Sequence, residues 1–184
     1  MTNPTSLSLS GVTLSPRFIF GCNGHIKNSL YIIDEGKRLL YTAGHNVVIY
    51  NPEDSENSGQ TLLPGSENCE KINFITVSPN ERYLAICERG ERAQCSIWDL
   101  NHKKKKKVLP DYNMDADFTS QEFVSAAFSP KNDKGHAHLM TLVGDPDWCL
   151  LFWAWDTCKI LSRVNLNIAE GIAKSIDSTN PLTF

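Results

Sequence analysis

Short apolar runs, each of four to seven residues, follow one another along the chain from Phe18 onward and are separated by Gly, Pro, Asn and Asp. The runs are rich in β-branched and aromatic side chains, a pattern that predicts many short β-strands. No window carries apolar residues at the 3.6-residue period of an amphipathic helix, so we expect few helices. Residues 1–16 are rich in Ser, Thr and Asn, and we expect a flexible N-terminus there.

The predicted strands form three groups that repeat two short motifs in the same order. A Ser-Pro pair, at 78–79 and 129–130, follows the first strand of the second and third groups, and a Trp-Asp pair ends the last strand. Tyr50-Asn51 takes the place of the Trp-Asp pair in the first group. This recurrence is typical of WD repeats, which have four strands in about 40–45 residues. The predicted strands are 30–33, 39–42 and 47–50; 72–77, 83–87 and 94–100; and 123–128, 138–143 and 149–155.

The repeat predicts an all-β fold, a partial WD40 β-propeller with about three antiparallel four-stranded blades and the start of a fourth. The inner strands of a blade lie between neighbouring blades and therefore read as continuous apolar runs. Because a ring needs about four to eight blades, we expect the remaining blades to come from the same or another chain. The incomplete propeller would occupy 17–184, with blades at 18–61, 62–107 and 108–166, the next blade starting in 167–184, and polar loops at 51–61, 101–120 and 131–137.

The two Trp-Asp pairs are the candidate structural positions of these repeats. Trp98 and Trp155 would fill the space between blades, and Asp99 and Asp156 would close the following turns by side-chain to backbone hydrogen bonds. The second and third blades lack the Gly-His pair of strong WD repeats, and Gly65-Ser66 occupies its place in the second. We therefore predict a divergent propeller, without the full hydrogen-bond network of strong repeats.

Composition and charge narrow the range of functions. Hydrophobic residues make up 41% of the chain and the net charge is −3, so no basic field of the whole protein would steer it to nucleic acid. Six cysteines form no CxxC pair and follow no secretory signal, which favours free thiols in a reducing compartment. The longest apolar run, 148–155, is far shorter than the roughly 20 residues of a membrane-spanning helix. We expect a soluble, intracellular protein without a membrane partner.

Five consecutive lysines form the strongest local charge, in the loop predicted after the first Trp-Asp pair. They are candidates for contact with an acidic partner surface, such as the acidic tails of tubulin. Two other interpretations remain open, a solvated loop between blades and a nuclear-localisation signal. The candidate residues are Lys103, Lys104, Lys105, Lys106 and Lys107.

The chain contains no catalytic motif of the HExxH, GxSxG, Walker A or GxGxxG type. His136 and His138 form an HxH pair in a loop of Lys, Asn and Asp, where no further ligand supports a metal site. We therefore expect no enzyme, no metal and no cofactor. A propeller hydrolase is the alternative from a different functional class.

Four ordered motifs resemble the N-terminal propeller of the cilia- and flagella-associated protein 57 family: Leu-Pro-Gly-Ser-Glu at 63–67, the Ser-Pro-Asn segment at 77–86, Lys-Val-Leu at 107–109 and Ala-Phe-Ser-Pro at 127–130. The likeness covers roughly residues 18–166. It implies tandem propellers followed by a coiled coil, and a structural protein-binding scaffold in the axoneme of the cilium or flagellum. It also implies support of inner dynein arm assembly or attachment on doublet microtubules, with tubulin, dynein-arm subunits and other axonemal proteins as candidate partners. The alternative is a WD-repeat adaptor in another cytosolic multiprotein complex.

Overall fold

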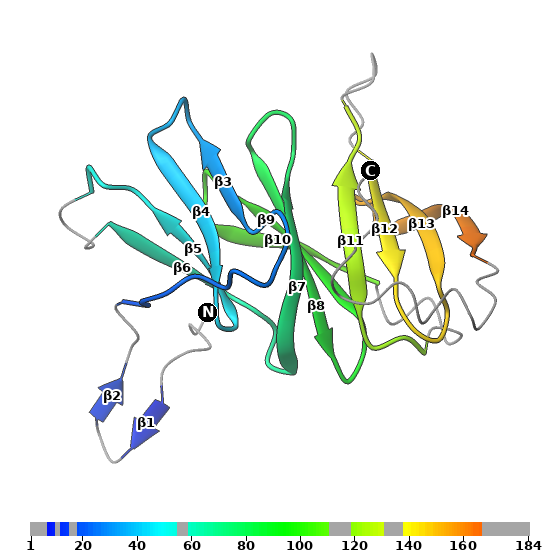
Figure 1. Cartoon of the computed structure of the whole chain (residues 1–184), viewed down its shortest axis with the longest axis horizontal. Coiled ribbons are helices and arrows are strands. Elements are labelled where there is room, and N and C mark those ends of the chain that lie inside the picture. Colours follow the sequence, from blue (N-terminus) through cyan, green and yellow to red (C-terminus); the bar gives the residue numbers. More distant parts are fainter. Residues whose placement is uncertain are drawn as a thin grey trace.

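The computed structural model describes residues 18–54, 59–110, 119–130 and 138–166, together with a two-stranded sheet of β1 (Leu7–Leu9) and β2 (Val12–Leu14). Three four-stranded antiparallel sheets follow one another along the chain and lie side by side (Figure 1). The first sheet contains β3 (Leu30–Ile33), β4 (Arg38–Ala43), β5 (Asn46–Tyr50) and β6 (Gln60–Pro64). The second contains β7 (Cys69–Val77), β8 (Tyr83–Gly90), β9 (Gln94–Asp99) and β10 (Lys104–Leu109). The third contains β11 (Phe123–Phe128), β12 (Leu139–Val143), β13 (Cys149–Ala154) and β14 (Lys159–Asn165).

The predicted fold class is confirmed, since the described chain is all-β and each sheet joins four consecutive strands as a propeller blade does. However, β10 lies within the loop predicted at 101–120, and β6 begins in the loop predicted at 51–61. β6 begins with the polar residues Gln60 and Thr61, and β10 begins with four lysines of which three are exposed, so neither gives the continuous apolar run by which nine other strands were recognised. The start of a further blade, predicted in 167–184, lies outside the described residues.

The sheets pack face to face through two apolar clusters. Consecutive residues of a strand point to opposite faces, so in β8 Leu84 faces the first sheet and Ala85 faces the third. The second sheet is therefore buried on both sides, as blades in the middle of a propeller are. Leu40, Ile49 and Leu63 cover it from the first sheet, and Leu139, Leu151 and Trp153 cover it from the third.

Strand register defines which residues occupy the same place in each sheet. Trp98 pairs with Leu84 and Trp153 pairs with Leu139, and each leucine pairs in turn with the last residue of the first strand of its sheet, Val77 or Phe128. Tyr50 pairs with Leu39 in the first sheet, as predicted from its order in the repeat. The residue equivalent to Trp98 is therefore Trp153 and not Trp155, which follows the end of β13. The predicted equivalence of the two Trp-Asp pairs is wrong by two residues, because Trp153-Ala154 lacks the acidic residue of the motif.

The largest exposed apolar side chains in the described parts of the chain lie at the two ends of this row of sheets. Leu30 and Ile32 of β3 are 60% and 64% exposed, on the face of the first sheet that points away from the second. The segment before β3 adds a stacked pair, Phe18 and Phe20, whose ring centroids are 6.1 Å apart. At the other end, Leu161 and Val164 of β14 are exposed. None of these six side chains belongs to the middle sheet.

Candidate functional site

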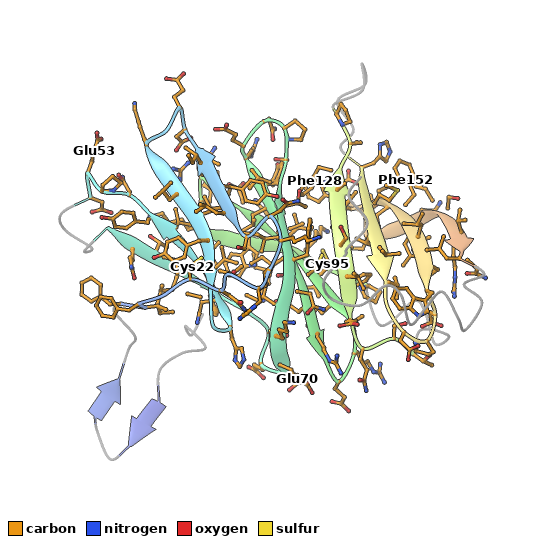
Figure 2. All side chains as sticks on the ribbon, viewed as in Figure 1. Cys22, Glu53, Glu70, Cys95, Phe128 and Phe152 are labelled. Carbon is orange, nitrogen blue, oxygen red and sulfur yellow. The ribbon has the colours of Figure 1, made fainter. Side chains whose placement is uncertain are left out.

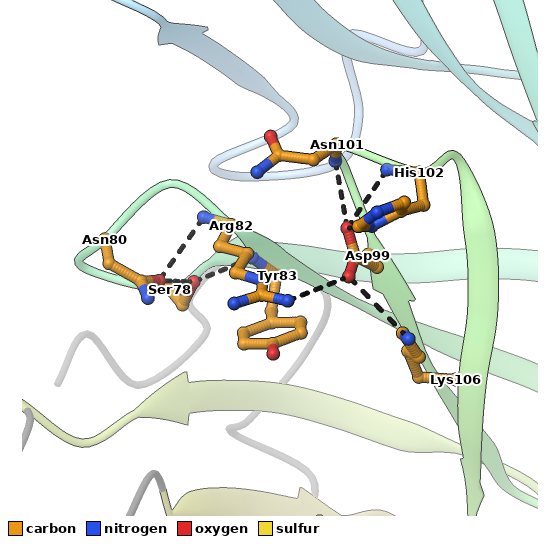
Figure 3. Close-up of polar contacts among 8 residues, drawn as sticks. All are labelled: Ser78, Asn80, Arg82, Tyr83, Asp99, Asn101, His102 and Lys106. Carbon is orange, nitrogen blue, oxygen red and sulfur yellow. Dashed lines mark hydrogen bonds and ion pairs between the residues drawn. The ribbon is translucent and has the colours of Figure 1, made fainter. Parts of the chain in front are cut away.

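A buried carboxylate organises the turn between β9 and β10. Asp99 ends β9, and its fully buried Oδ1 accepts hydrogen bonds from the backbone N–H groups of Asn101 and His102, both at 3.1 Å (Figure 3). An aspartate that binds the backbone two and three residues ahead fixes a turn. The predicted turn-closing contact is present at Asp99, whereas the exposed Asp156 accepts, among the described residues, from the adjacent N–H of Thr157 alone.

Cationic groups surround the second oxygen of this carboxylate. Asp99 Oδ2 lies 3.5 Å from an Nη of Arg82 and 3.9 Å from Nζ of Lys106. Burial acts to raise the pKa of Asp99, but the hydrogen bonds from His102 and the charges of His102 and Arg82 outweigh it and hold that pKa below its usual range. The carboxylate is therefore ionised at neutral pH and links Lys106 of the lysine run to Arg82 in the turn before β8.

The Ser-Pro motif of the second sheet forms the turn that presents Arg82. Ser78 Oγ donates to Asn80 Oδ1 at 2.6 Å and accepts from the backbone N–H of Tyr83 at 2.9 Å (Figure 3). Tyr83 then packs edge-on against Trp155 of the third sheet, with ring centroids 4.8 Å apart. This turn therefore joins the Asp99 site to the contact between two sheets.

Most of the lysine run forms an edge strand, so the prediction that these lysines lie in a loop is wrong. Lys104 to Lys107 belong to β10, which pairs with β9 through a bulge at Lys106. Asp99 fixes the turn that leads into the strand, so the lysines continue the sheet despite their charge. Lys103, in the turn itself, donates to Thr61 Oγ1 of the first sheet at 3.0 Å, and the ammonium of Lys105 lies 5.2 Å from the centroid of the Trp98 ring.

Both equivalent tryptophans bind a hydroxyl. Trp153 Nε1 donates to Thr141 Oγ1 on the neighbouring strand at 2.9 Å, and Trp98 Nε1 donates to Ser96 Oγ on its own strand at 3.2 Å. Trp155 is buried between the second and third sheets, against Tyr83 and Phe128, but its Nε1 has no hydrogen-bond partner among the described residues. The structure thus places tryptophans between the sheets, and the register gives the repeat role to Trp98 and Trp153.

In each of the two loops that lead into the second and third sheets, a serine donates hydrogen bonds to a carboxylate. Ser66 donates through its backbone N–H and its hydroxyl to Oε2 of the buried Glu88. Ser120 donates through the same two groups to Asp147 Oδ2, at 2.9 and 2.7 Å. Burial acts to raise the pKa of Asp147, but the hydrogen bonds from Ser120 and the backbone outweigh it and lower that pKa. The sequence pattern alone did not reveal these serine–carboxylate pairs.

The middle of the molecule holds buried thiols. Cys87 and Cys95 are directly opposite each other on β8 and β9, with their sulfur atoms 3.8 Å apart, too far for a disulfide. Cys95 lies in the interior between the second and third sheets (Figure 2). The hydrogen bond with Cys87 and burial raise the pKa of Cys95. Burial and the charge of Glu88 raise the pKa of Cys69 to about 12. The thiols of Cys95 and Cys69 are therefore neutral, and the buried cysteines act as small apolar side chains.

Metal-binding side chains do not gather in the described parts of the chain, where no group of three or more His, Cys, Asp or Glu could hold an ion. His138 stacks on Phe152 with ring centroids 5.0 Å apart, and His136 lies outside the described residues. Within those residues, no helix is long and apolar enough to cross a membrane.

Stacked four-stranded sheets with an aromatic residue at the same place on each third strand, Tyr50, Trp98 or Trp153, define this chain as part of a WD-repeat β-propeller. No model of a protein family matches it. The chain is 30% identical over 159 residues to cilia- and flagella-associated protein 57 of Mus musculus, which covers 85% of this chain and 12% of that protein. Over most of its length the chain is similar to the cilia- and flagella-associated protein 57 family, and the resemblance predicted from its motifs is confirmed.

Two further relatives extend this comparison. Cilia- and flagella-associated protein 57 C of Tetrahymena thermophila is 31% identical over 160 residues, which are 85% of this chain and 12% of the relative. Cilia- and flagella-associated protein 52 of Mus musculus is 27% identical over 139 residues, which are 74% of this chain and 20% of the relative. The chain therefore spans a small fraction of the length of the relatives it matches.

Proposed function

We propose that this chain is part of a structural, protein-binding scaffold of the ciliary or flagellar axoneme. The scaffold supports the assembly or attachment of inner dynein arms on doublet microtubules, and it acts by binding and not by catalysis. One observation carries the proposal. The relatives have different numbers in their names and come from distant organisms, yet all are named for their association with cilia and flagella.

The packing of the sheets supports a scaffold role. The middle sheet is buried on both faces, and hydrogen-bonded side chains fix the turns on either side of its strands. Edges and turns held in this way are suitable for binding other axonemal proteins, because little conformational freedom remains to be lost on binding. The proposed partner-contact residues are the lysines at 103–107, in the turn before β10 and on β10 itself.

We further propose that additional blades cover the two end faces of the row. Leu39 of the first sheet occupies the place of Leu84 and Leu139, each of which is covered by the preceding sheet. The same face of the first sheet leaves Leu30 and Ile32 exposed. A covering sheet from the same or another chain would remove these side chains from water, at about 25 cal/mol per Å² of apolar area.

The axonemal role is tested by locating the tagged full-length protein in ciliated cells and by co-sedimenting it with purified doublet microtubules. We expect the protein in the axoneme, and we expect its loss to reduce the inner dynein arms seen by electron microscopy. Normal inner arms in the absence of the protein would contradict the dynein-arm role. Localisation to a cytosolic complex outside the cilium would instead support the adaptor alternative.

The covering of the end faces is tested with a dye that fluoresces on exposed apolar surface. The isolated chain should bind the dye, and a longer protein that includes the neighbouring blades should bind much less. Substitution of Leu30 and Ile32 by Thr should lower dye binding by the isolated chain. A folded, monomeric chain that binds no dye would contradict the proposal.

A further inference from the structure

We propose that the free edge of β10 binds an extended acidic peptide, which adds to the second sheet as a further strand. The proposal deepens the scaffold function proposed above, because it names the partner chemistry and the binding mode of the lysine strand. It depends on the protein-binding role and not on the axonemal location.

The first observation is the open edge of the strand. β10 is the outermost strand of the second sheet, and among the described strands it pairs with β9 alone. The outer side of an edge strand presents N–H and C=O groups to which another extended chain can bind. Lys104, Lys105 and Lys106 are exposed along this edge and Lys107 is half-buried, so side chains that pair with them would meet water-accessible ammonium groups.

The second observation is a positive charge that the surrounding structure compensates only in part. The chain has a net charge of −3, yet five positive charges stand in succession at 103–107. Among the residues that the structure describes, the ion pair recorded for these lysines joins Lys106 to Asp99 at 3.9 Å. Lys103 and Lys105 contact the neutral groups of Thr61 and Trp98, which orient their ammonium groups without neutralising them. Such an edge repels basic strands and attracts acidic ones.

The third observation is that the strand is held in place before any partner arrives. The Asp99 carboxylate fixes the turn before β10, and Lys103 adopts the left-handed φ of 52° that this turn requires. The contact of Lys103 with Thr61 also ties the turn to the first sheet. A peptide would therefore meet a formed edge, and little ordering entropy would be lost on the protein side.

The outer strands of the other two sheets show that this combination is specific to β10. β6 ends in Pro64, which has no N–H for a further strand, and it contains no charged residue. β14 carries Lys159 and Arg163 but also exposes Leu161 and Val164, so its edge is largely apolar. Within the described chain, β10 alone joins an open edge to a run of like charges.

The proposal is tested with two fluorescent peptides as long as β10, both rich in Glu alternating with Thr or Val. One has an unmodified backbone, and the other has the same charge with two Thr replaced by Pro. We expect the first to bind the 184-residue chain at low ionic strength about tenfold more tightly than the second, because proline removes N–H donors from the added strand. Equal binding of the two peptides would overturn strand addition.

A protein variant tests the position of the site. The variant replaces four lysines by Gln and retains the Lys106–Asp99 pair; the replaced residues are Lys103, Lys104, Lys105 and Lys107. Its affinity for the peptide with the unmodified backbone should be lower by at least about tenfold. The matched control removes four other exposed lysines, at 27, 37, 71 and 159, and should change binding less than about threefold. Circular dichroism establishes that both variants fold. Equal losses in the two variants, or no binding by the unmodified chain, would overturn the proposal.

The source of the acidic partner is tested by competition. A single-stranded oligonucleotide of equal charge should displace the peptide poorly, because it cannot form the backbone hydrogen bonds of a sheet. Displacement at equal concentration would show a general polyanion surface and overturn the proposal. The axonemal localisation experiment is independent of these measurements, so failure of this inference and failure of the proposed function are distinguishable.

Discussion

The second and third sheets bury an equivalent tryptophan but satisfy its N–H from different strands. In the third sheet, Thr141 on β12 accepts the hydrogen bond from Trp153. The place of Thr141 in the second sheet is taken by Ile86, and the hydroxyl comes from Ser96, the residue that pairs with Ile86 across the strands. The buried N–H requires an acceptor on that face, because an unsatisfied donor is costly. Which of the two paired residues supplies it is free to vary.

The turns that follow these tryptophans differ more. Asp99 and Ala154 are equivalent, since each ends the third strand and pairs with the first residue of the fourth. The carboxylate of Asp99 holds its turn, whereas the turn after Ala154 is closed by the N–H of Thr157, which donates to the Ala154 carbonyl at 3.2 Å. The acidic residue is retained in the sheet whose fourth strand begins with lysines, where its charge offsets theirs. The comparison teaches that register is common to the sheets and that turn chemistry is local.

The largest expected effect is the loss of either equivalent tryptophan. Trp153→Ala should lower the free energy of unfolding by about 3–5 kcal/mol, because a large side chain that is 1% exposed leaves a cavity. Trp98→Ala should fall in the same range. Denaturant unfolding followed by circular dichroism measures both. A loss below about 1 kcal/mol at Trp153 would contradict its equivalence to Trp98.

Removal of the turn carboxylate should have the next largest effect. Asp99→Ala leaves the N–H groups of Asn101 and His102 without their acceptor and Arg82 without its partner, and should cost about 2 kcal/mol. Asp156→Ala, at the exposed position, is the matched control and should stay within about 0.5 kcal/mol of the parent. Comparable losses in the two variants would show that the turns are not distinct.

An exchange of hydroxyl positions sharpens the comparison. Thr141→Ile should cost about 1–2 kcal/mol, because Trp153 Nε1 loses its acceptor. Adding Leu151→Ser places the hydroxyl on the paired residue of β13, as in the second sheet. A double-mutant cycle should show the two changes to be less harmful together than their sum by about 1 kcal/mol. Strict additivity would mean that Ser96 is not a substitute for Thr141.

The smallest expected effect is a difference in acid sensitivity. Asp99 and Asp147 both have pKa values below the usual range in the folded chain, so the stability that each provides is present above the unfolded pKa of about 4 and is lost as pH falls through the folded pKa. Asp99→Asn should flatten the fall in unfolding free energy below that pH, and Asp147→Asn should do the same in the third sheet. If the free energy of unfolding falls with acid pH as steeply in both variants as in the parent, the stabilising role of these carboxylates is contradicted.

The apolar runs predicted nine of the strands in the three sheets, since buried strands between blades need large side chains on both faces. The outer strands were missed because polar or charged residues interrupt their apolar runs, and β10 in particular looks like a solvated loop until the Asp99 turn is seen. At the site, Trp98-Asp99 was found from its motif. Trp153 was missed because a second Trp-Asp pair follows it two residues later.

The paired thiols of the second sheet have a practical consequence. Cys87 and Cys95 are fully buried, whereas Cys22 is exposed on the segment before β3. In the native chain an alkylating reagent should therefore modify Cys22 within its ordinary reaction time, while the central pair reacts only when β8 and β9 separate. The rate at which the two central cysteines are alkylated therefore measures how often the middle blade opens. Binding of a neighbouring blade, or of a peptide at its edge, should lower that rate.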